Sequence, residues 1–475
     1  MNNNRKVVLW FRNDLRLHDN EALQEAISNA QELYPIYVFD ERVFQGSTKY
    51  GFRKTDVFRA KFIIESIHDL RNSLRHKGSN LMVRIGKPEE VLFDIAKELK
   101  TSWIFCNRER TDEEKQVQDK LEQELWTVGQ EIRYSRGKML YYTADLPFPV
   151  THAPEIFTQF RKEVEKFIPI REPFDIPERL PVISDEIEFG QIPTLSDLGF
   201  SEDDIERAEG TLLQGGETAG LERLDYYLWK SDHISEYKET RNGLLGMDYS
   251  SKLSSYLSHG CVSPKMVYAE LSRYEKERIK NKSTYWLYFE LLWRDFFRLM
   301  GKKHGNDIFK KHGLKRKRRD DLSDDMALFR VWAEARTGVP FIDAAMLELN
   351  TTGFMSNRSR QNVASFLVND LNVNWQIGAE YFESLLIDYD PCSNWCNWNY
   401  VAGVGNDPRE GRYFNTIKQA QRYDPDGAFV KHWLPQLDRL DGHYVHQPYL
   451  LSEEQQDEYQ FTLGKDYPKV CVKLP

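Results

Sequence analysis

The sequence lacks the short motifs that identify many enzyme classes. It has no GxGxxG dinucleotide fingerprint, no GxxxxGK(S/T) phosphate loop, no HExxH zinc motif and no GxSxG nucleophile turn. These absences count against a nicotinamide-dependent dehydrogenase, a P-loop nucleotidase, a zinc protease and a serine hydrolase. They leave room for a cofactor that hydroxyl groups and helix ends hold instead.

Cysteine and long apolar runs are also scarce. The five cysteines form an odd, sparse set that predicts reduced thiols in a cytoplasmic compartment. Cys392 and Cys396 have helical spacing, but no second pair of ligands completes a zinc site, so we expect no metal. No apolar run approaches the ~18 residues that span a bilayer, and the chain begins without a signal-peptide core, so we expect no membrane association.

Charge gives an ambiguous signal. The net charge of −9 over 475 residues does not predict general nucleic-acid binding. Residues 310–319 (KKHGLKRKRR) nevertheless concentrate positive charge. Two interpretations stay open for this segment: a local contact with nucleic acid, or a solvated loop that Asp320 and Asp321 compensate.

The first 135 residues alternate strand and helix patterns. Strands are expected at 6–11, 34–39, 81–85, 102–106 and 131–135, and helices at 22–27, 55–74, 88–99 and 112–126. This alternation predicts a doubly wound parallel sheet covered by helices. The segment 136–210 contains eight prolines and few periodic stretches, so we expect a long connection that runs over the surface.

The remainder of the chain, 211–475, has a helical pattern with few strand signals. Helices are expected at 221–228, 264–277, 284–300, 326–335, 341–350, 359–371 and 378–387. The predicted fold class is therefore α/β plus all-α. The predicted domains are 1–135, the connection 136–210, and the helical domain 211–475.

Two segments combine residue types that suggest a binding site. Hydroxyl groups cluster at 250–254 (SSKLS) before a helix, where they could hold a phosphate or simply cap the helix. Glu290, Trp293 and Arg294 share one helical face. Charges in a core must be paired, so this face indicates either a polar cavity or a buried Glu–Arg pair beside a packing Trp.

Two further segments lie later in the chain. Asn357, Arg360 and Gln361 share a helical face within a long motif at 338–371. Asp388 and Asp390 lie two residues apart in a polar loop and need nearby cations. We expect Arg360 to pair with Asp388.

These four segments resemble the flavin-binding core of the photolyase/cryptochrome family, and the resemblance runs through nearly the whole chain. It implies that the helical domain binds FAD. By resemblance, the pyrophosphate is held by Tyr237, Ser250, Ser251, Leu253 and Ser254. The residues that the resemblance places around the flavin are Arg294, Asn357, Arg360, Asp388, Asp390 and Asn394, with Asn394 facing flavin N5.

The resemblance also implies blue-light electron transfer from reduced FAD to a pyrimidine dimer. Glu290 and Trp293 would line the dimer cavity opposite Tyr400, with Asn357 and Asn394 at the flavin side. Glu290 would hydrogen-bond the thymine, with a raised pKa if the cavity is dry. An electron-hopping chain would run from Trp398 through Trp375 to Trp332 at the surface, although three packing indoles are the simpler alternative. Glu109 matches the residue that contacts a folate antenna, methenyltetrahydrofolate; an exposed loop Glu is the alternative.

Departures within the motifs indicate one branch of the family. Tyr400 stands where duplex-DNA photolyases usually have a second Trp, and Gln361 stands where they tend to have Met. Both changes, together with the segment 409–427, are similar to the DASH cryptochromes. We expect a monomer that repairs cyclobutane pyrimidine dimers, preferentially in single-stranded DNA. The alternatives are a signalling cryptochrome with little repair, a duplex-DNA photolyase, and a flavoenzyme that does not use light.

Overall fold

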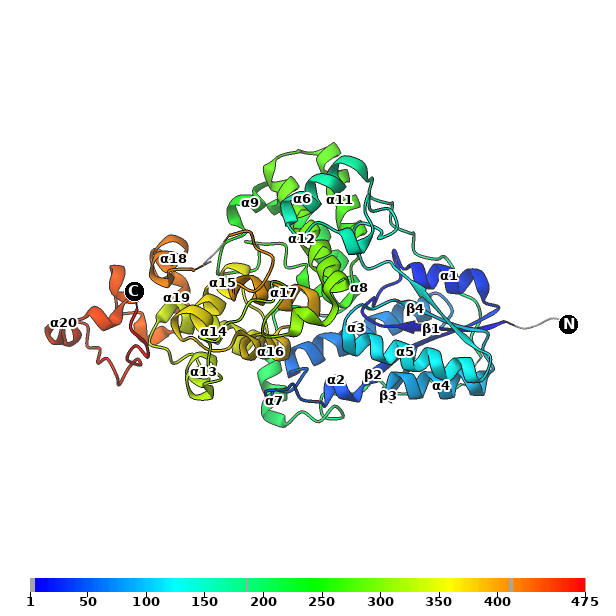
Figure 1. Ribbon diagram of the computed structural model, residues 1–475, viewed down its shortest axis with the longest axis horizontal. Coiled ribbons are helices and arrows are strands. Elements are labelled where there is room, and N and C mark those ends of the chain that lie inside the picture. The colour runs from blue at the N-terminus through cyan, green and yellow to red at the C-terminus, as the bar shows by residue number, and fades with distance from the viewer. Residues whose placement is uncertain (1–4, 185–186, 410–412, 475) are drawn as a thin grey trace.

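The computed structural model describes residues 5–184, 187–409 and 413–474. Five strands form one parallel sheet in the order β3-β2-β1-β4-β5 (Figure 1). The chain leaves β1 in both directions, which makes the sheet doubly wound, as predicted. The strands are β1 (Lys6–Phe11), β2 (Glu32–Asp40), β3 (Met82–Gly86), β4 (Trp103–Asn107) and β5 (Glu131–Ser135).

Both faces of this sheet are covered, because side chains alternate along each strand. Val8 and Trp10 of β1 face a core that includes Leu92 of one helix and Leu121 of another. The alternate residues of β1 face the larger core, which continues into the helical part of the molecule. The helices are α1 (Glu21–Asn29), α2 (Glu41–Phe44), α3 (Val57–His76), α4 (Pro88–Leu99) and α5 (Asp112–Thr127).

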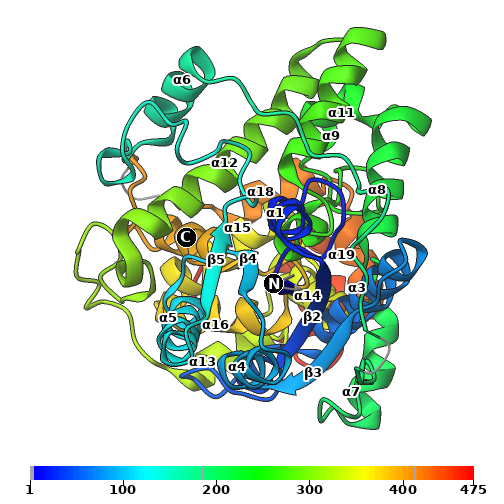
Figure 2. The same cartoon turned by 90° about the vertical axis from the view of Figure 1, so that its right-hand side faces the viewer.

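The Pro-rich connection contains a helix that the sequence pattern did not predict. This helix, α6 (Phe157–Phe167), buries Phe157, Phe160 and Val164. It packs on the long helix α12, and the chain then crosses the molecule to α7 (Glu202–Arg207) (Figures 1 and 2). The connection therefore contributes an apolar face to the helical half of the molecule.

All seven helices predicted for the C-terminal half are present. Two of them, α8 and α15, continue into single π-helical turns at Tyr226–Lys230 and Phe366–Asp370. The helices are α8 (Glu217–Asp225), α9 (Tyr237–Thr240), α10 (Ser254–His259), α11 (Pro264–Glu277), α12 (Lys282–His304), α13 (Met326–Ala333), α14 (Pro340–Thr352), α15 (Asn357–Ser365), α16 (Trp375–Leu385), α17 (Pro391–Val401), α18 (Thr416–Tyr423), α19 (Ala428–Trp433) and α20 (Glu453–Glu458).

The helix α12 runs through the middle of the helical half and contacts α6, α9, α11 and α17. Asn281 caps its N-terminus through the backbone N–H groups of Ser283 and Thr284. Because α12 is 23 residues long, it can contact all four of these helices. In the described ranges, no helix combines the length and apolar character that crossing a membrane requires.

Candidate functional site

One cavity collects residues from five separate segments of the helical half. It has a volume of about 270 Å³ and lies among α9, the loop before α10, α12, the start of α15 and the loop before α17. The predicted residues that line it are Tyr237, Ser250, Ser251, Leu253, Ser254, Glu290, Arg294, Asn357, Arg360, Asp388 and Asp390. The structure thus brings together side chains that lie up to about 150 positions apart in the chain.

Arg223 holds the serine-rich loop in place. Its guanidinium donates to the carbonyl oxygens of Ser251 at 3.0 Å and Ser250 at 3.1 Å. Lys252 follows with a left-handed backbone (φ 57°), and its ammonium lies 3.5 Å from the ring centroid of Tyr249. Burial lowers the pKa of Lys252 to about 7. Sequence reasoning missed this cavity-lining cation, whose only signal was its place inside the serine cluster.

A carboxylate–guanidinium pair lies at another wall of the cavity. Arg241 binds Glu290 at 2.8 Å. Burial raises the pKa of Glu290, and the positive charge of Arg241 opposes the rise. The expected direction of this pKa shift is confirmed, while Arg241 was not predicted, because it lies on a segment distant from α12.

Arg294 is fixed by backbone carbonyls from two parts of the chain. It donates to Lys138 at 2.7 Å and to Leu257 at 3.0 Å. Burial lowers the pKa of Arg294 to about 10, and the positive charge of Arg298 acts in the same direction. This guanidinium therefore lines the cavity as a rigidly held donor.

The predicted pair between Arg360 and Asp388 is confirmed, with a distance of 2.9 Å. Arg360 also donates to the carbonyl of Met355 at 2.9 Å. The second oxygen of Asp388, Oδ1, is buried and accepts no hydrogen bond from the described residues. Such an acceptor, beside hydroxyl groups and a buried ammonium, fits a ligand that has both N–H donors and phosphates, which are features of FAD.

Asp390 caps the N-terminus of α17 and accepts hydrogen bonds from a side chain and from the backbone. Its carboxylate accepts from Arg298 at 2.6 Å and from the backbone N–H of Ser393 at 2.8 Å. Burial favours the neutral form, but the charges of Arg298 and Arg294 hold the pKa of Asp390 below its ordinary value. Asp390 is therefore a buried, ionised acceptor at the cavity wall.

Three predicted site residues, Asn394, Trp293 and Tyr400, are not among the residues that line this cavity. The amide of Asn394 donates to the carbonyl of Ala379 at 3.0 Å. The rings of Trp293 and Tyr400 meet edge to face at a centroid distance of 6.0 Å. Phe157 of α6 stacks on Trp293 at 3.7 Å with an interplanar angle of 7°, so one face of this indole is covered. Phe157 comes from the connection, which sequence reasoning did not include in the site.

The three tryptophans predicted to carry electrons are all buried. Trp332 is 0% exposed, so the prediction of a surface position is wrong. The helix α13 turns this residue inward, and its indole donates to the carbonyl of Val363 at 3.0 Å. Phe382 lies between Trp332 and Trp398, with centroid distances of 6.3 and 5.1 Å. Trp375 instead contacts Trp395 at 5.7 Å.

Glu109 lies at the junction of the sheet and α12. It is 3% exposed, which excludes an exposed loop position. Burial opposes its ionisation, but the charges of Lys138, Arg12 and Arg298 lower the pKa of Glu109 to about 2. Its carboxylate pairs with Lys138 and lies 3.6 Å from Arg298.

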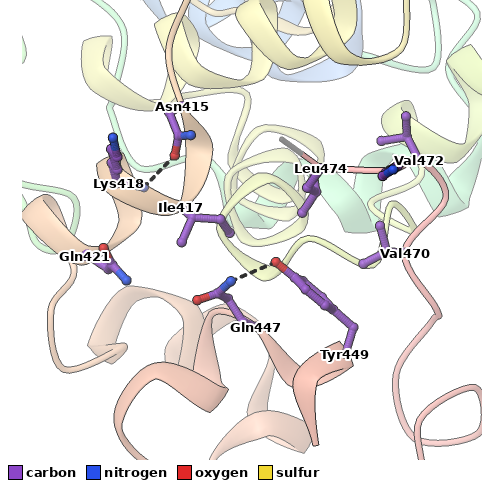
Figure 3. A pocket seen from close by; sticks show the side chains of 10 residues that line it. Asn415, Ile417, Lys418, Gln421, Gln447, Tyr449, Val470, Val472 and Leu474 are labelled. Carbon is purple, nitrogen blue, oxygen red and sulfur yellow. Dashed lines mark hydrogen bonds between the residues drawn. The ribbon is translucent and has the colours of Figure 1, made fainter.

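A second cavity, with a volume of about 570 Å³, is lined by residues near the C-terminal end of the described chain. It lies between α18, the segment around Gln447 and Tyr449, and the last described residues (Figure 3). Its lining includes Lys418 and Lys473 but none of the residues predicted for the site.

The described residues contain no cluster of three or more His, Cys, Asp or Glu side chains that could hold a metal ion. The predicted segment 409–427 includes Glu410, Gly411 and Arg412, which lie outside the described residues.

Two family models match the chain. The model described as the FAD binding domain of DNA photolyase matches residues 286–475, and the model described as DNA photolyase matches residues 7–178. The first covers α12, the start of α15 and the loop before α17, which supply Glu290, Arg360 and Asp388 to the cavity. The chain belongs to the photolyase/cryptochrome family of flavoproteins.

Within this family, the similar proteins are DASH cryptochromes, as predicted. A Cryptochrome DASH of Synechocystis is 47% identical over 470 residues, covering 98% of this chain and 95% of the relative. A relative from Arabidopsis thaliana, named Cryptochrome DASH, chloroplastic/mitochondrial, is 48% identical and covers 93% of this chain and 78% of its own length. The crystal structure of a Synechocystis cryptochrome has a TM-score of 0.94 at 46% identity, covering 100% of this chain and 98% of that chain.

Proposed function

We propose that this protein binds FAD in the cavity and uses blue light to repair cyclobutane pyrimidine dimers, preferentially in single-stranded DNA. The observation that carries the proposal is the cavity itself. Glu290, predicted to contact the dimer, lines the same space as Arg360 and Asp388, predicted to contact the flavin. When bound and reduced, FAD would supply the excited electron that opens the cyclobutane ring.

The residues of the chain supply binding and electrostatics. Ser250, Ser251 and Lys252 would hold the pyrophosphate, with Tyr237, Leu253 and Ser254 beside them. Asp388 would accept from the flavin ring through Oδ1, the oxygen that Arg360 leaves free. Glu290, with its raised pKa, would present a hydrogen bond to the thymine. Asn357 and Asn394 would complete the flavin side, and Trp398 would pass electrons to the flavin, with Trp375 as the next indole of the transfer chain.

The preference for single strands follows from the wall of the dimer site. A dimer that enters beside Trp293 would have Tyr400, with a single ring, as the second aromatic wall. Stacking of an aromatic ring on a base contributes about 1–3 kcal/mol. Extruding a base from a duplex costs a few kcal/mol, and a single strand avoids most of that cost. The smaller ring therefore penalises duplex substrates more than single strands.

The test is repair of a thymine dimer by the reduced protein under blue light, on matched single-stranded and duplex oligonucleotides. We expect repair of the single strand, little repair of the duplex, and no repair in the dark. The variant Tyr400→Trp should raise duplex repair and leave single-strand repair within about twofold. Equal repair of both substrates by the wild-type protein contradicts the preference. FAD binding without any repair would favour the alternative, a signalling photoreceptor.

We also propose that methenyltetrahydrofolate binds near Glu109 as an antenna. Burial and the positive charges of Arg110, Arg136 and Arg108 lower the pKa of Lys302 to about 8. This cationic setting suits the carboxylates of a folate. Adding the folate to the purified protein should produce a new absorption band and sensitise FAD to shorter wavelengths. A protein that retains FAD but takes up no folate contradicts this part of the proposal.

The proposal includes a cellular location and an oligomeric state. All five cysteines are free thiols, which suits the reducing cytoplasm. We propose a cytoplasmic monomer, and sedimentation of the FAD-loaded protein at several concentrations tests the oligomeric state.

A further inference from the structure

A buried network of charges connects the sheet domain to the cavity. Glu109 follows β4, Lys138 follows β5, Arg298 lies on α12, and Asp390 begins α17. All four side chains are buried. Buried charges are costly unless they are paired, so the position of each group depends on the others.

The network has two branches that start at Glu109. In the first, Arg298 bridges two carboxylates, with Asp390 at 2.6 Å and Glu109 at 3.6 Å. In the second, the ammonium of Lys138 binds Glu109, while its carbonyl accepts from Arg294 at 2.7 Å. Each branch ends at a residue that lines the cavity, Asp390 or Arg294.

The bridge determines how Arg298 is oriented. Its two terminal nitrogens face the two carboxylates, whereas its Nε is buried and makes no hydrogen bond with the described residues. An arginine that leaves one buried donor unsatisfied is held by its ion pairs rather than by full hydrogen bonding. Loss of either carboxylate would therefore remove one of the two ion pairs that orient the guanidinium.

Asp390 passes the effect of the bridge into α17. Its carboxylate caps this helix through the backbone N–H of Ser393. The helix carries Asn394 and Trp398, and Ser393 lines the cavity. A change in the position or charge balance of Asp390 would thus reach several groups on the flavin side.

We propose that Glu109 is a positioning residue for the FAD cavity. Through Arg298 and Lys138, this carboxylate of the sheet domain sets the orientation of Asp390 and Arg294 and the local charge that they present. The inference rests on the proposed binding of FAD. It gives Glu109 a role that does not require an antenna, and it couples the two domains electrostatically. Coupling between sites is reciprocal, so a ligand that neutralised Glu109 would be sensed at the flavin.

The experiment compares Glu109→Gln with Glu113→Gln in the FAD-loaded protein. Glu113 is a matched control because it lies on α5, carries the same charge, and has a side chain that is 70% exposed and paired with Lys54. Loss of the buried negative charge should shift the reduction equilibrium of bound FAD toward the reduced form by about tenfold, within the usual range of coupling between linked sites. Glu113→Gln should change it by less than about twofold.

Two further variants separate charge from packing. Glu109→Asp keeps the charge and should restore most of the wild-type equilibrium, even if the shorter side chain lowers stability. Arg298→Lys removes the two-pronged bridge but keeps its charge. In that background, the effect of Glu109→Gln should fall well below tenfold, as a double-mutant cycle would show.

The outcomes are distinct. If Glu109→Gln and Glu113→Gln behave alike, or if the effects of Glu109→Gln and Arg298→Lys are additive, the inference is overturned. If Glu109→Asp matches Glu109→Gln, packing rather than charge explains the change, and the inference also fails. A wild-type protein that binds no FAD would instead contradict the proposed function. If Glu109→Gln does not fold, Arg298→Lys alone tests the bridge. A shift in the reduction equilibrium of bound FAD would then support the inference, and no shift would overturn it.

Discussion

Removing Arg241 should change the ionisation of Glu290 by an amount that the structure allows us to work out. Two unit charges about 4 Å apart interact by about 4 kcal/mol near a protein surface. The side chain of Glu290 is 30% exposed and that of Arg241 is 16% exposed, so solvent screens part of this energy. We therefore expect Arg241→Gln to cost the ionised form about 1–3 kcal/mol, which raises the pKa of Glu290 by roughly one to two units.

The direction follows from the two opposing causes. Burial already raises the pKa of Glu290, and Arg241 opposes that rise. A carboxyl group with a raised pKa in the folded state contributes most to stability when it is protonated, and this contribution is lost as pH rises through the folded pKa. Without Arg241, the loss should occur at higher pH, so the variant should gain stability relative to wild type as the pH is lowered toward the ordinary pKa of Glu.

The assay is infrared titration of the protonated carboxyl band, assigned by its absence in Glu290→Gln. In Arg241→Gln, the band should persist to higher pH than in wild type. Arg273→Gln is the control, because it breaks a pair of the same length, 2.8 Å, whose arginine is 53% exposed. An unchanged titration in Arg241→Gln, or an equal change in the control, would refute the reasoning.

Two other changes test the framework around the cavity. Gly260 ends α10 with φ 69°, and a methyl group there would collide with the carbonyl oxygen of Asn13, whereas Gly246, with φ 86°, has open space around its Cβ position. Thermal unfolding should show that Gly260→Ala is clearly more destabilising than Gly246→Ala, which should lose only about 1 kcal/mol for the backbone strain; equal losses would argue against close packing. Asp388→Asn leaves Arg360 without its carboxylate, which costs about 3–5 kcal/mol for a buried pair, and the purified variant should contain much less FAD than wild type.

The sequence predicted the sheet domain well because its elements have strong local signals. The strands β1 and β5 and the helix α4 begin and end at the expected residues. Pro88 occupies the first turn of α4, where a missing N–H group costs nothing. Local periodicity and end signals suffice where each element buries a well-defined face.

The same reasoning failed where burial has no periodic pattern. The helix α17 is not among the predicted helices, because its sequence, PCSNWCNWNYV, shows no apolar stripe. The structure buries this helix on most sides, including Asn394 and Asn399. Its first turn is stabilised by Asp390, and the stabilising cation comes from α12. Such a helix can be recognised only when its neighbours are known.

The site shows the same contrast between what local sequence predicts and what depends on distant segments. Residues of the cavity could be named by resemblance, yet most of their partners could not, because the partners lie on segments distant in sequence. Arg241, Arg298 and Lys138 each neutralise a predicted acid or fix a predicted arginine, and Phe157 covers one face of Trp293.

These partners explain why a set of charged groups can line a buried cavity at all. Each guanidinium on the described wall is shared between the cavity and the scaffold: Arg360 with Asp388, Arg241 with Glu290, and Arg294 with backbone carbonyls. The charges are therefore fixed in place before any ligand arrives, and little reorganisation energy is needed when a ligand gains or loses an electron. A cavity built in this way suits a redox cofactor better than a substrate that must be bound and released in each cycle.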